Sequence, residues 1–240
     1  MKLLEKRHAL VWALIPVSLL VFVFVSLCVG RYPISVREVI SALLSPAFDF
    51  SLDSRITGIV GYIRLPRTIL GLLVGGSLSV AGTAFQGLFR NPLVSSGMLG
   101  VSAGSGFGAA LAIVLFGRNP MIYPFSFLFG GVAVVASYLV GRIYKSATNI
   151  TLVLGGVIIG SLFSAMVSFL KYIADPYDQL PAIVFWLMGS LASAGYKEIF
   201  IAGIAMILGC GGLFAIRYKI NVLAVGEKEA RTMGVNVSLV

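Results

Sequence analysis

Residues 65–85 read LPRTILGLLVGGSLSVAGTAF, with Arg67 as the single charged side chain. About 20 apolar residues in an α-helix cross a bilayer core about 30 Å thick. Small residues also recur at every fourth position of this stretch and so share one helix face: Gly71, Gly75, Ser79 and Thr83. Small residues let membrane helices approach closely, which replaces the hydrophobic drive that lipid does not supply. The stretch therefore predicts a membrane-spanning helix with a packing face.

The composition extends this prediction to the whole chain. Of the 240 residues, 58% are hydrophobic and only 11% are charged, and the mean hydropathy is +1.00. A soluble globular domain is about 25% charged. The formal charge of +9 does not indicate nucleic-acid binding, because the Lys and Arg residues lie between apolar runs. We therefore expect an all-α, polytopic membrane protein.

Six apolar stretches are long enough to span the membrane: 9–29, 65–85, 98–116, 121–140, 150–170 and 199–216. The first follows Lys2, Lys6 and Arg7 and resembles a signal peptide, but its length and the lack of a small-residue cleavage site favour a retained helix. A seventh stretch, 180–194, is too short to span, and its length is typical of a re-entrant or interfacial helix.

The distribution of charge predicts the orientation. With a cytoplasmic N-terminus, the cytoplasmic segments hold ten basic and three acidic residues, and the outer segments hold eight basic and six acidic ones. This bias agrees with the positive-inside rule. The bias weakens if 180–194 is counted as a span, so we place that stretch on the outer side. The expected location is the cytoplasmic (inner) membrane of a bacterium.

Few residues could support enzyme chemistry. His8 is the single histidine, Cys28 and Cys210 lie in separate apolar runs, and the six spans contain no acidic residue. These facts argue against a catalytic triad, a metal site and a proton relay. The glycines of 104–108 suit helix packing better than a phosphate loop, and no GxxxxGK[ST] motif occurs. ATP-driven work would therefore need a partner subunit, and we expect this chain to bind no cofactor.

Arg64 and Arg67 lie at the expected outer end of the second span, beside Pro66. On spacing alone, the favoured interpretation is that they anchor the helix by snorkelling to lipid headgroups. The alternative is docking of an acidic partner, because a guanidinium pairs well with carboxylates.

The link after the second span, 86–93, contains Asn91 followed by Pro92. This pair predicts a turn, because proline disfavours helix at the residue before it. Taken alone, the link needs no role beyond connecting two spans.

The segment 221–237 follows the last span and predicts a short amphipathic helix. Its narrow apolar stripe consists of Leu223, Gly226, Ala230 and Met233. Gly234 is placed to end the helix. The stripe lacks aromatic residues and a run of lysines, so it favours insertion into a groove on a soluble partner over a membrane anchor.

These blocks resemble the FecCD/BtuC-like permeases of binding-protein-dependent ABC importers. The match is close over 64–105 (RLPRTILGLLVGGSLSVAGTAFQGLFRNPLVSSGMLGVSAGS). It recurs at 152–161 (LVLGGVIIGS), 185–190 (FWLMGS) and 223–235 (LAVGEKEARTMGV). The resemblance implies a ten-helix permease that works as a homodimer with two cytoplasmic ATPase subunits, which carry ATP and Mg, and an extracytoplasmic binding protein.

The resemblance also implies roles for particular residues. Arg64 and Arg67 would form salt bridges with glutamates of the binding protein, which replaces the snorkelling interpretation. ATPase coupling would involve Leu223, Gly226, Glu227, Ala230, Met233 and Gly234. The cytoplasmic gate region would include Gln86, Asn91, Pro92 and Leu93, and the loop at 145–149 matches a second gate loop only loosely.

The chain stops after the expected coupling segment, so we expect one permease domain over 1–240, truncated at its C-terminus, with about six of the ten helices. The predicted function is import of an iron–siderophore complex by alternating access. The alternatives are import of cobalamin or haem, a remnant that does not transport, or, less favoured, an intramembrane enzyme.

Overall fold

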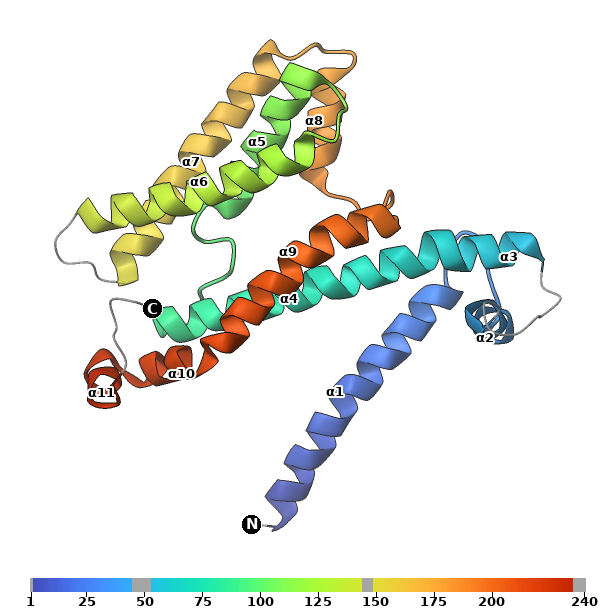
Figure 1. Cartoon of the computed structure of the whole chain (residues 1–240), viewed down its shortest axis with the longest axis horizontal. Helices are drawn as coiled ribbons and strands as arrows, with labels where there is room; N and C mark the ends of the chain where they lie inside the picture. The colour runs from blue at the N-terminus through green and yellow to red at the C-terminus, as the bar shows by residue number, and fades with distance from the viewer. Residues whose placement is uncertain (1, 45–52, 144–148, 235–240) are drawn as a thin grey trace. The chain divides into compact units, whose positions relative to one another are not determined.

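A computed structural model of the chain describes residues 2–44, 53–143 and 149–234, and these ranges are helical without a strand (Figure 1). The all-α prediction is confirmed. In chain order the elements are α1 (Lys2–Cys28), α2 (Val36–Leu44), α3 (Ser54–Gly58), the π-helix η1 (Ile59–Arg64), α4 (Leu65–Phe89), α5 (Val101–Phe116), α6 (Ile122–Ile143), α7 (Asn149–Ile173), α8 (Gln179–Met188), α9 (Tyr196–Ala215), α10 (Arg217–Val225) and α11 (Glu227–Thr232).

Each predicted span corresponds to a helix. Four helices are long and apolar enough to cross a membrane: Ser54–Phe89, Ile122–Arg142, Thr151–Ile173 and Tyr196–Ala215. The other two predicted spans correspond to α1, whose apolar part is Trp12–Cys28, and to the 16-residue α5. The helix of the expected third span, α5, begins at Val101 and not at residue 98. The residue before it, Gly100, has a φ of 74° and is the last residue of the turn that precedes α5. With ten residues, α8 is too short to span, as its sequence predicted.

The chain divides into two compact units. Unit 1 consists of Met1–Ser77 and Leu191–Gly209, and unit 2 consists of Leu78–Ser190 and Cys210–Val240. The division falls inside α4 and α9, so both helices contribute residues to each unit. The expectation that residues 1–240 belong to a single permease domain stays a prediction.

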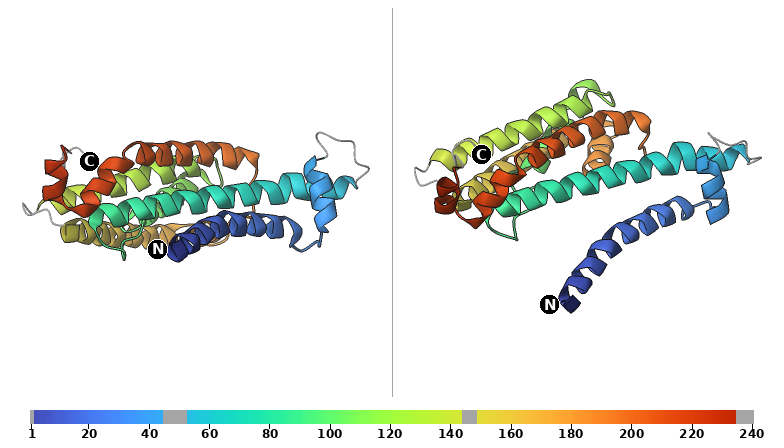
Figure 2. Two further views of the ribbon diagram at one scale, coloured as in Figure 1. Left: turned by 90° about the horizontal axis from the view of Figure 1, so that it is seen from below. Right: turned by 60° about the horizontal axis from the view of Figure 1, so that its bottom comes forward.

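In unit 2, α5, α6 and α7 all pack against one another (Figure 2). A helix that is apolar on all sides belongs in a protein interior, and α5 has this pattern. Phe107 of α5 contacts two aromatic side chains, Phe129 of α6 at 5.0 Å and Phe163 of α7 at 5.5 Å between ring centroids. α8 closes the same cluster with the fully buried Ile183.

Glycines set how closely these helices approach. A Cβ at Gly104 would lie 2.6 Å from both Ala133 Cβ and the Phe129 carbonyl oxygen, and a Cβ at Gly108 would overlap the Phe125 carbonyl. The glycines of 104–108 therefore serve helix packing, which confirms that interpretation over a phosphate loop. The two glycines of the predicted α4 packing face lie in looser surroundings. A Cβ at Gly71 would lie 3.6 Å from Leu191, an ordinary contact, and a Cβ at Gly75 would meet no atom within 4 Å.

Unit 1 joins the end of α1 to α2 and η1 through a small apolar cluster that includes Leu27, Val39 and Val60. The start of α2 is a capping box, in which the Ser35 hydroxyl and backbone N–H donate to Glu38 Oε2 at 2.7 and 2.8 Å. The Ser35 hydroxyl, followed by its backbone N–H, holds the pKa of the Glu38 carboxyl below its usual value.

The second predicted span starts earlier than expected, because α3, η1 and α4 form one continuous helix, Ser54–Phe89. Pro66 was expected near a helix start but lies inside this helix, two residues after the end of η1. Proline has no N–H to donate. In the i to i−5 pattern of a π-helix, an N–H at position 66 would donate to Gly61 O. Tyr196 Oη donates to this carbonyl instead, at 2.8 Å. A side chain from α9 thus replaces the missing helical hydrogen bond.

The close packing in unit 2 predicts different outcomes for two glycines. Gly108→Ala should lower the free energy of unfolding by about 1–3 kcal/mol, the usual cost of overpacking, because its Cβ would overlap the backbone of α6. Gly131→Ala on α6 is the matched control, since a Cβ there meets no atom within 4 Å. Thermal unfolding in detergent measures both. Equal melting temperatures for the two variants would contradict the packing assignment.

Candidate functional site

The structure separates the two arginines expected to act together. Arg64 is the last residue of η1, is only 8% exposed, and bonds to backbone carbonyls near the end of α1. Its Nη1 donates to Leu27 O at 2.6 Å and Cys28 O at 2.9 Å, and its Nη2 donates to Tyr32 O. The guanidinium of Arg64 thus faces the protein itself.

Arg67, three residues later on α4, is exposed. Its Nε donates to Leu191 O at 3.1 Å and its Nη2 donates to Ala192 O at 2.8 Å, in the loop before α9. A guanidinium has five N–H donors. These two bonds fix the direction of the Arg67 side chain and leave donors on the exposed guanidinium for an acidic group.

A groove of about 710 Å³ lies between α1 and the η1–α4 junction in unit 1. Its apolar lining includes Val25, Val29 and Ile63, and its basic lining includes Arg31 and Arg67. Ser26 and Thr68, which also line it, share a hydrogen bond of 2.7 Å between their hydroxyls. The groove is a feature of this helix junction and holds no cluster of catalytic groups among its lining residues.

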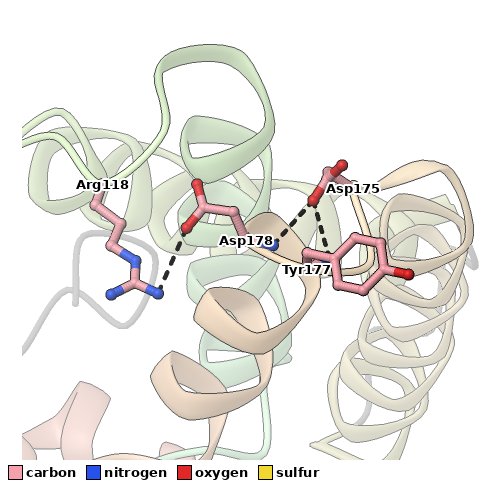
Figure 3. A network of polar contacts seen from close by, with 4 residues as sticks. All are labelled: Arg118, Asp175, Tyr177 and Asp178. Atoms are coloured by element: carbon pink, nitrogen blue, oxygen red, sulfur yellow. Dashed lines mark hydrogen bonds and ion pairs between the residues drawn. The ribbon is translucent and has the colours of Figure 1, made fainter.

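The entry to α8 is fixed by a small polar network (Figure 3). The carboxylate of Asp175 accepts from the backbone N–H groups of Tyr177 and Asp178, both at 2.9 Å. Arg118, from the link between α5 and α6, forms an exposed ion pair with Asp178 at 3.5 Å. Gln179 bonds in two directions, accepting from Asp175 N and donating to Val114 O of α5 at 3.2 Å. These contacts hold the start of α8 on the end of α5.

The expected gate region is a tight turn at the end of α4, as Asn91 and Pro92 predicted. Gln86 Nε2 donates to Pro92 O at 3.1 Å, and Asn91 Oδ1 accepts from Leu93 N at 3.0 Å. The side chain of Leu93 is 83% exposed. The turn is therefore internally braced and presents an apolar side chain outward. The described residues exclude 144–148, so most of the second candidate gate loop, at 145–149, lies outside them.

The expected coupling segment differs from its prediction. Instead of one helix over 221–237, α10 ends at Val225 and α11 begins at Glu227, with Gly226 between them. Gly234 follows α11 with a φ of 76°, as expected of a glycine that ends a helix. The side chain of Glu227 and residues 235–237 lie outside the part of the chain that the structure describes.

The apolar stripe is used differently from the prediction. Leu223 of α10 and Ala230 of α11 are buried in one cluster, and Ala230 is 0% exposed. Met233 is 58% exposed. The stripe was expected to enter a groove on a partner, but most of it holds α10 against α11. The surface left for a partner includes exposed side chains outside this cluster, among them Val225, Lys228, Glu229, Arg231 and Met233.

The coupling segment contacts the helix that leads into the gate turn. A Cβ at Gly87 of α4 would lie 3.3 Å from Ile220 Cγ2 and 3.9 Å from Ala224 Cβ, both on α10. Gly87 is next to Gln86, which braces the turn. Gly87 continues the spacing of Gly71, Gly75, Ser79 and Thr83 by a further four residues, but it was not counted with them in the predicted packing face. No local pattern pairs it with α10, so this contact was missed.

Comparisons with known proteins agree with this architecture. The model of the FecCD transport family matches residues 18–240. The chain is 34% identical over 220 residues to the molybdate import system permease protein MolB of Haemophilus influenzae, covering 92% of this chain and 65% of that protein. It is 40% identical over 185 residues to a probable iron chelatin transport system permease protein of Helicobacter pylori, covering 76% of this chain and 55% of that one.

A solved structure is also similar, with a TM-score of 0.77 and 34% identity, covering 92% of this chain and 66% of the other. It is described as an inward-facing conformation of an ABC transporter assigned to the metal-chelate type. The chain thus spans less than two thirds of the length of each of these relatives.

Proposed function

The chain belongs to the FecCD transport family, and we propose that it is the membrane-spanning permease subunit of an ATP-driven importer. The observation that carries the proposal is the family match over 18–240, which includes the long apolar helices and also α10 and α11. A transport subunit changes the position of its cargo and not its chemistry, so it needs no catalytic constellation. The proposed location is the cytoplasmic membrane of a bacterium, with the N-terminus in the cytoplasm.

The proposed mechanism is alternating access. A loaded extracytoplasmic binding protein docks first, and Arg67 offers it an exposed guanidinium held in a fixed direction by Leu191 O and Ala192 O. ATP and Mg bind to partner ATPase subunits in the cytoplasm, whose closure moves the α10–α11 segment. The contact of Gly87 with α10 then passes this motion to the turn at 86–93.

The proposed assembly contains two permease subunits, two ATPase subunits and the binding protein, surrounded by lipid. The cargo is an iron–siderophore complex, and the similarity to the Helicobacter pylori iron chelatin permease supports this choice. Cobalamin and haem are alternative cargoes for the same mechanism, and molybdate is another because of the similarity to MolB. A remnant that does not transport is the alternative of a different class.

The cargo assignment predicts uptake of iron carried by a siderophore. Cells that express the complete protein with its ATPase and binding protein should accumulate radiolabelled iron from the siderophore complex, and excess molybdate, haem or cobalamin should not compete. Cells without the protein are the control. Competition by one of these compounds would reassign the cargo, and uptake equal to the control would contradict transport of iron.

The docking assignment predicts a charge effect at Arg67. Arg67→Glu should weaken binding of the loaded binding protein, and the loss should be larger at low salt because ionic screening is then weaker. Arg55→Glu is the matched control, since it makes the same change of charge at an exposed position of α3 in unit 1. Binding to protein in nanodiscs measures both. Equal affinities for the two variants would contradict docking at Arg67.

The coupling route predicts an effect of bulk at Gly87. Gly87→Leu should push α10 away from α4, because even a Cβ there lies 3.3 Å from Ile220. ATP hydrolysis should continue while the amount of cargo imported per ATP falls several-fold. Gly82→Leu is the control on the same helix, since a Cβ there meets no atom within 4 Å. The route is wrong if both variants import the same amount of cargo per ATP.

A further inference from the structure

We propose that Arg64 is a positioning residue that caps the C-terminal end of α1, and that it does not itself contact the extracytoplasmic partner. The capping role is independent of the importer assignment. Its second consequence, that Arg67 alone of the pair is available for docking, rests on that proposed function.

The end of α1 needs hydrogen-bond donors. The last four carbonyls of an α-helix have no helical N–H to bind, and α1 ends at Cys28. Arg64 Nη1 donates to two of these carbonyls, Leu27 O and Cys28 O, at 2.6 and 2.9 Å. Its Nη2 donates to Tyr32 O, in the turn that follows. One side chain therefore fixes both the helix end and the path of the chain beyond it.

The charge of Arg64 suits this position. The C-terminal end of a helix carries a partial negative charge, which a buried cation offsets. Burial of a charge is costly unless the charge is hydrogen-bonded. With 8% of Arg64 exposed, its guanidinium is compensated by three carbonyl oxygens, so these bonds are stronger than bonds between neutral groups.

Gly30 provides the space for this cap. A Cβ at Gly30 would lie 2.7 Å from Arg64 Nη2 and 3.1 Å from Arg64 Cζ. Gly30 is not among the glycines with positive φ, so an alanine there would change the available space without straining the backbone. The absence of a side chain at Gly30 is thus explained by the guanidinium that lies against it.

Arg64 is the last residue of the π-helix. The N–H of Leu65 bonds to Val60 O, five residues earlier, so η1 has a wider turn than an α-helix. Arg64, at the end of this wider turn, is buried, whereas Arg67, three residues later on α4, is exposed.

The cap holds α1 beside the part of α4 that carries Arg67. The hydroxyls of Ser26 and Thr68 meet at 2.7 Å, two residues before the capped end of α1 and one residue after Arg67. Loss of the cap should therefore loosen the 28–32 segment first. Removal of Arg64 would also disturb docking, but only through this local loss of order.

Cys28 is a native reporter of the cap, because it is half-buried and its carbonyl accepts from Arg64. Residues 1–240 contain two cysteines, so Cys210→Ser, with any cysteine outside this range also replaced by serine, leaves Cys28 as the only thiol. The rate at which a maleimide labels Cys28 in the complete protein in membranes measures how often the segment opens. This measurement needs no cargo, ATPase or binding protein.

Arg64→Met keeps the apolar stem and removes the donors, and it should raise the labelling rate at least about tenfold. Gly30→Ala should raise the rate by a smaller factor, about threefold, by displacing the guanidinium. Arg64→Lys keeps one cationic centre and should restore most of the protection. Gly58→Ala, where a Cβ meets no atom within 4 Å, is the control and should leave the rate unchanged.

Two results would overturn the proposal. The first is an unchanged labelling rate in Arg64→Met, or in Gly30→Ala if the first variant does not fold. The second result concerns the affinity for the binding protein. If Arg64 acts only as a cap on α1, this affinity should be near normal in Arg64→Lys. If Arg64→Lys keeps Cys28 protected but lowers that affinity as strongly as Arg67→Glu, Arg64 contacts the partner directly. Failure of the importer assignment alone would leave the labelling results unchanged.

Discussion

A chain in lipid must satisfy its own backbone polar groups, because hydrocarbon offers no hydrogen-bond partner. Several polar contacts between elements of this structure satisfy such groups. Arg64 serves the carbonyls at the end of α1, and Tyr196 serves the Gly61 carbonyl that Pro66 leaves without a donor. The fully buried Ser137 donates to Leu99 O at 2.8 Å, before the start of α5, and Gln179 donates to Val114 O near its end. Each of these bonds serves a helix end or an irregular turn.

The same places carry the proposed function, because irregular backbone is where a helical protein can present side chains and change direction. Arg67 follows the π-helix, the braced turn at 86–93 follows the end of α4, and Gly226 separates α10 from α11. Between these points, glycines hold α5 tightly against its neighbours.

The sequence predicted a helix at each of the six expected spans, and four helices among the described residues are long and apolar enough to cross a membrane. Length and hydropathy can be read directly from the sequence, which is why these helices were predictable. The sequence also predicted the packing role of Gly104 and Gly108 and the turn at Asn91, which depend on local spacing and on proline. It did not predict the π-helix, because Pro66 suggested a helix start. It treated Arg64 and Arg67 as equivalent, because burial of Arg64 depends on Gly30, far away in the chain, and no local pattern reveals that contact. The break at Gly226 was missed because the stripe on either side keeps a helical spacing.

In the proposed function, this chain couples ATP hydrolysis in a partner to movement of cargo. The most direct test is ATP hydrolysis by the complete protein in proteoliposomes with its ATPase subunits, measured with loaded binding protein, with empty binding protein and with none. We expect the highest rate of ATP hydrolysis with the loaded binding protein. We also expect cargo to accumulate inside the vesicles, and this accumulation should require ATP. Hydrolysis that is the same in all three conditions, with no accumulation of cargo, would contradict the proposed function.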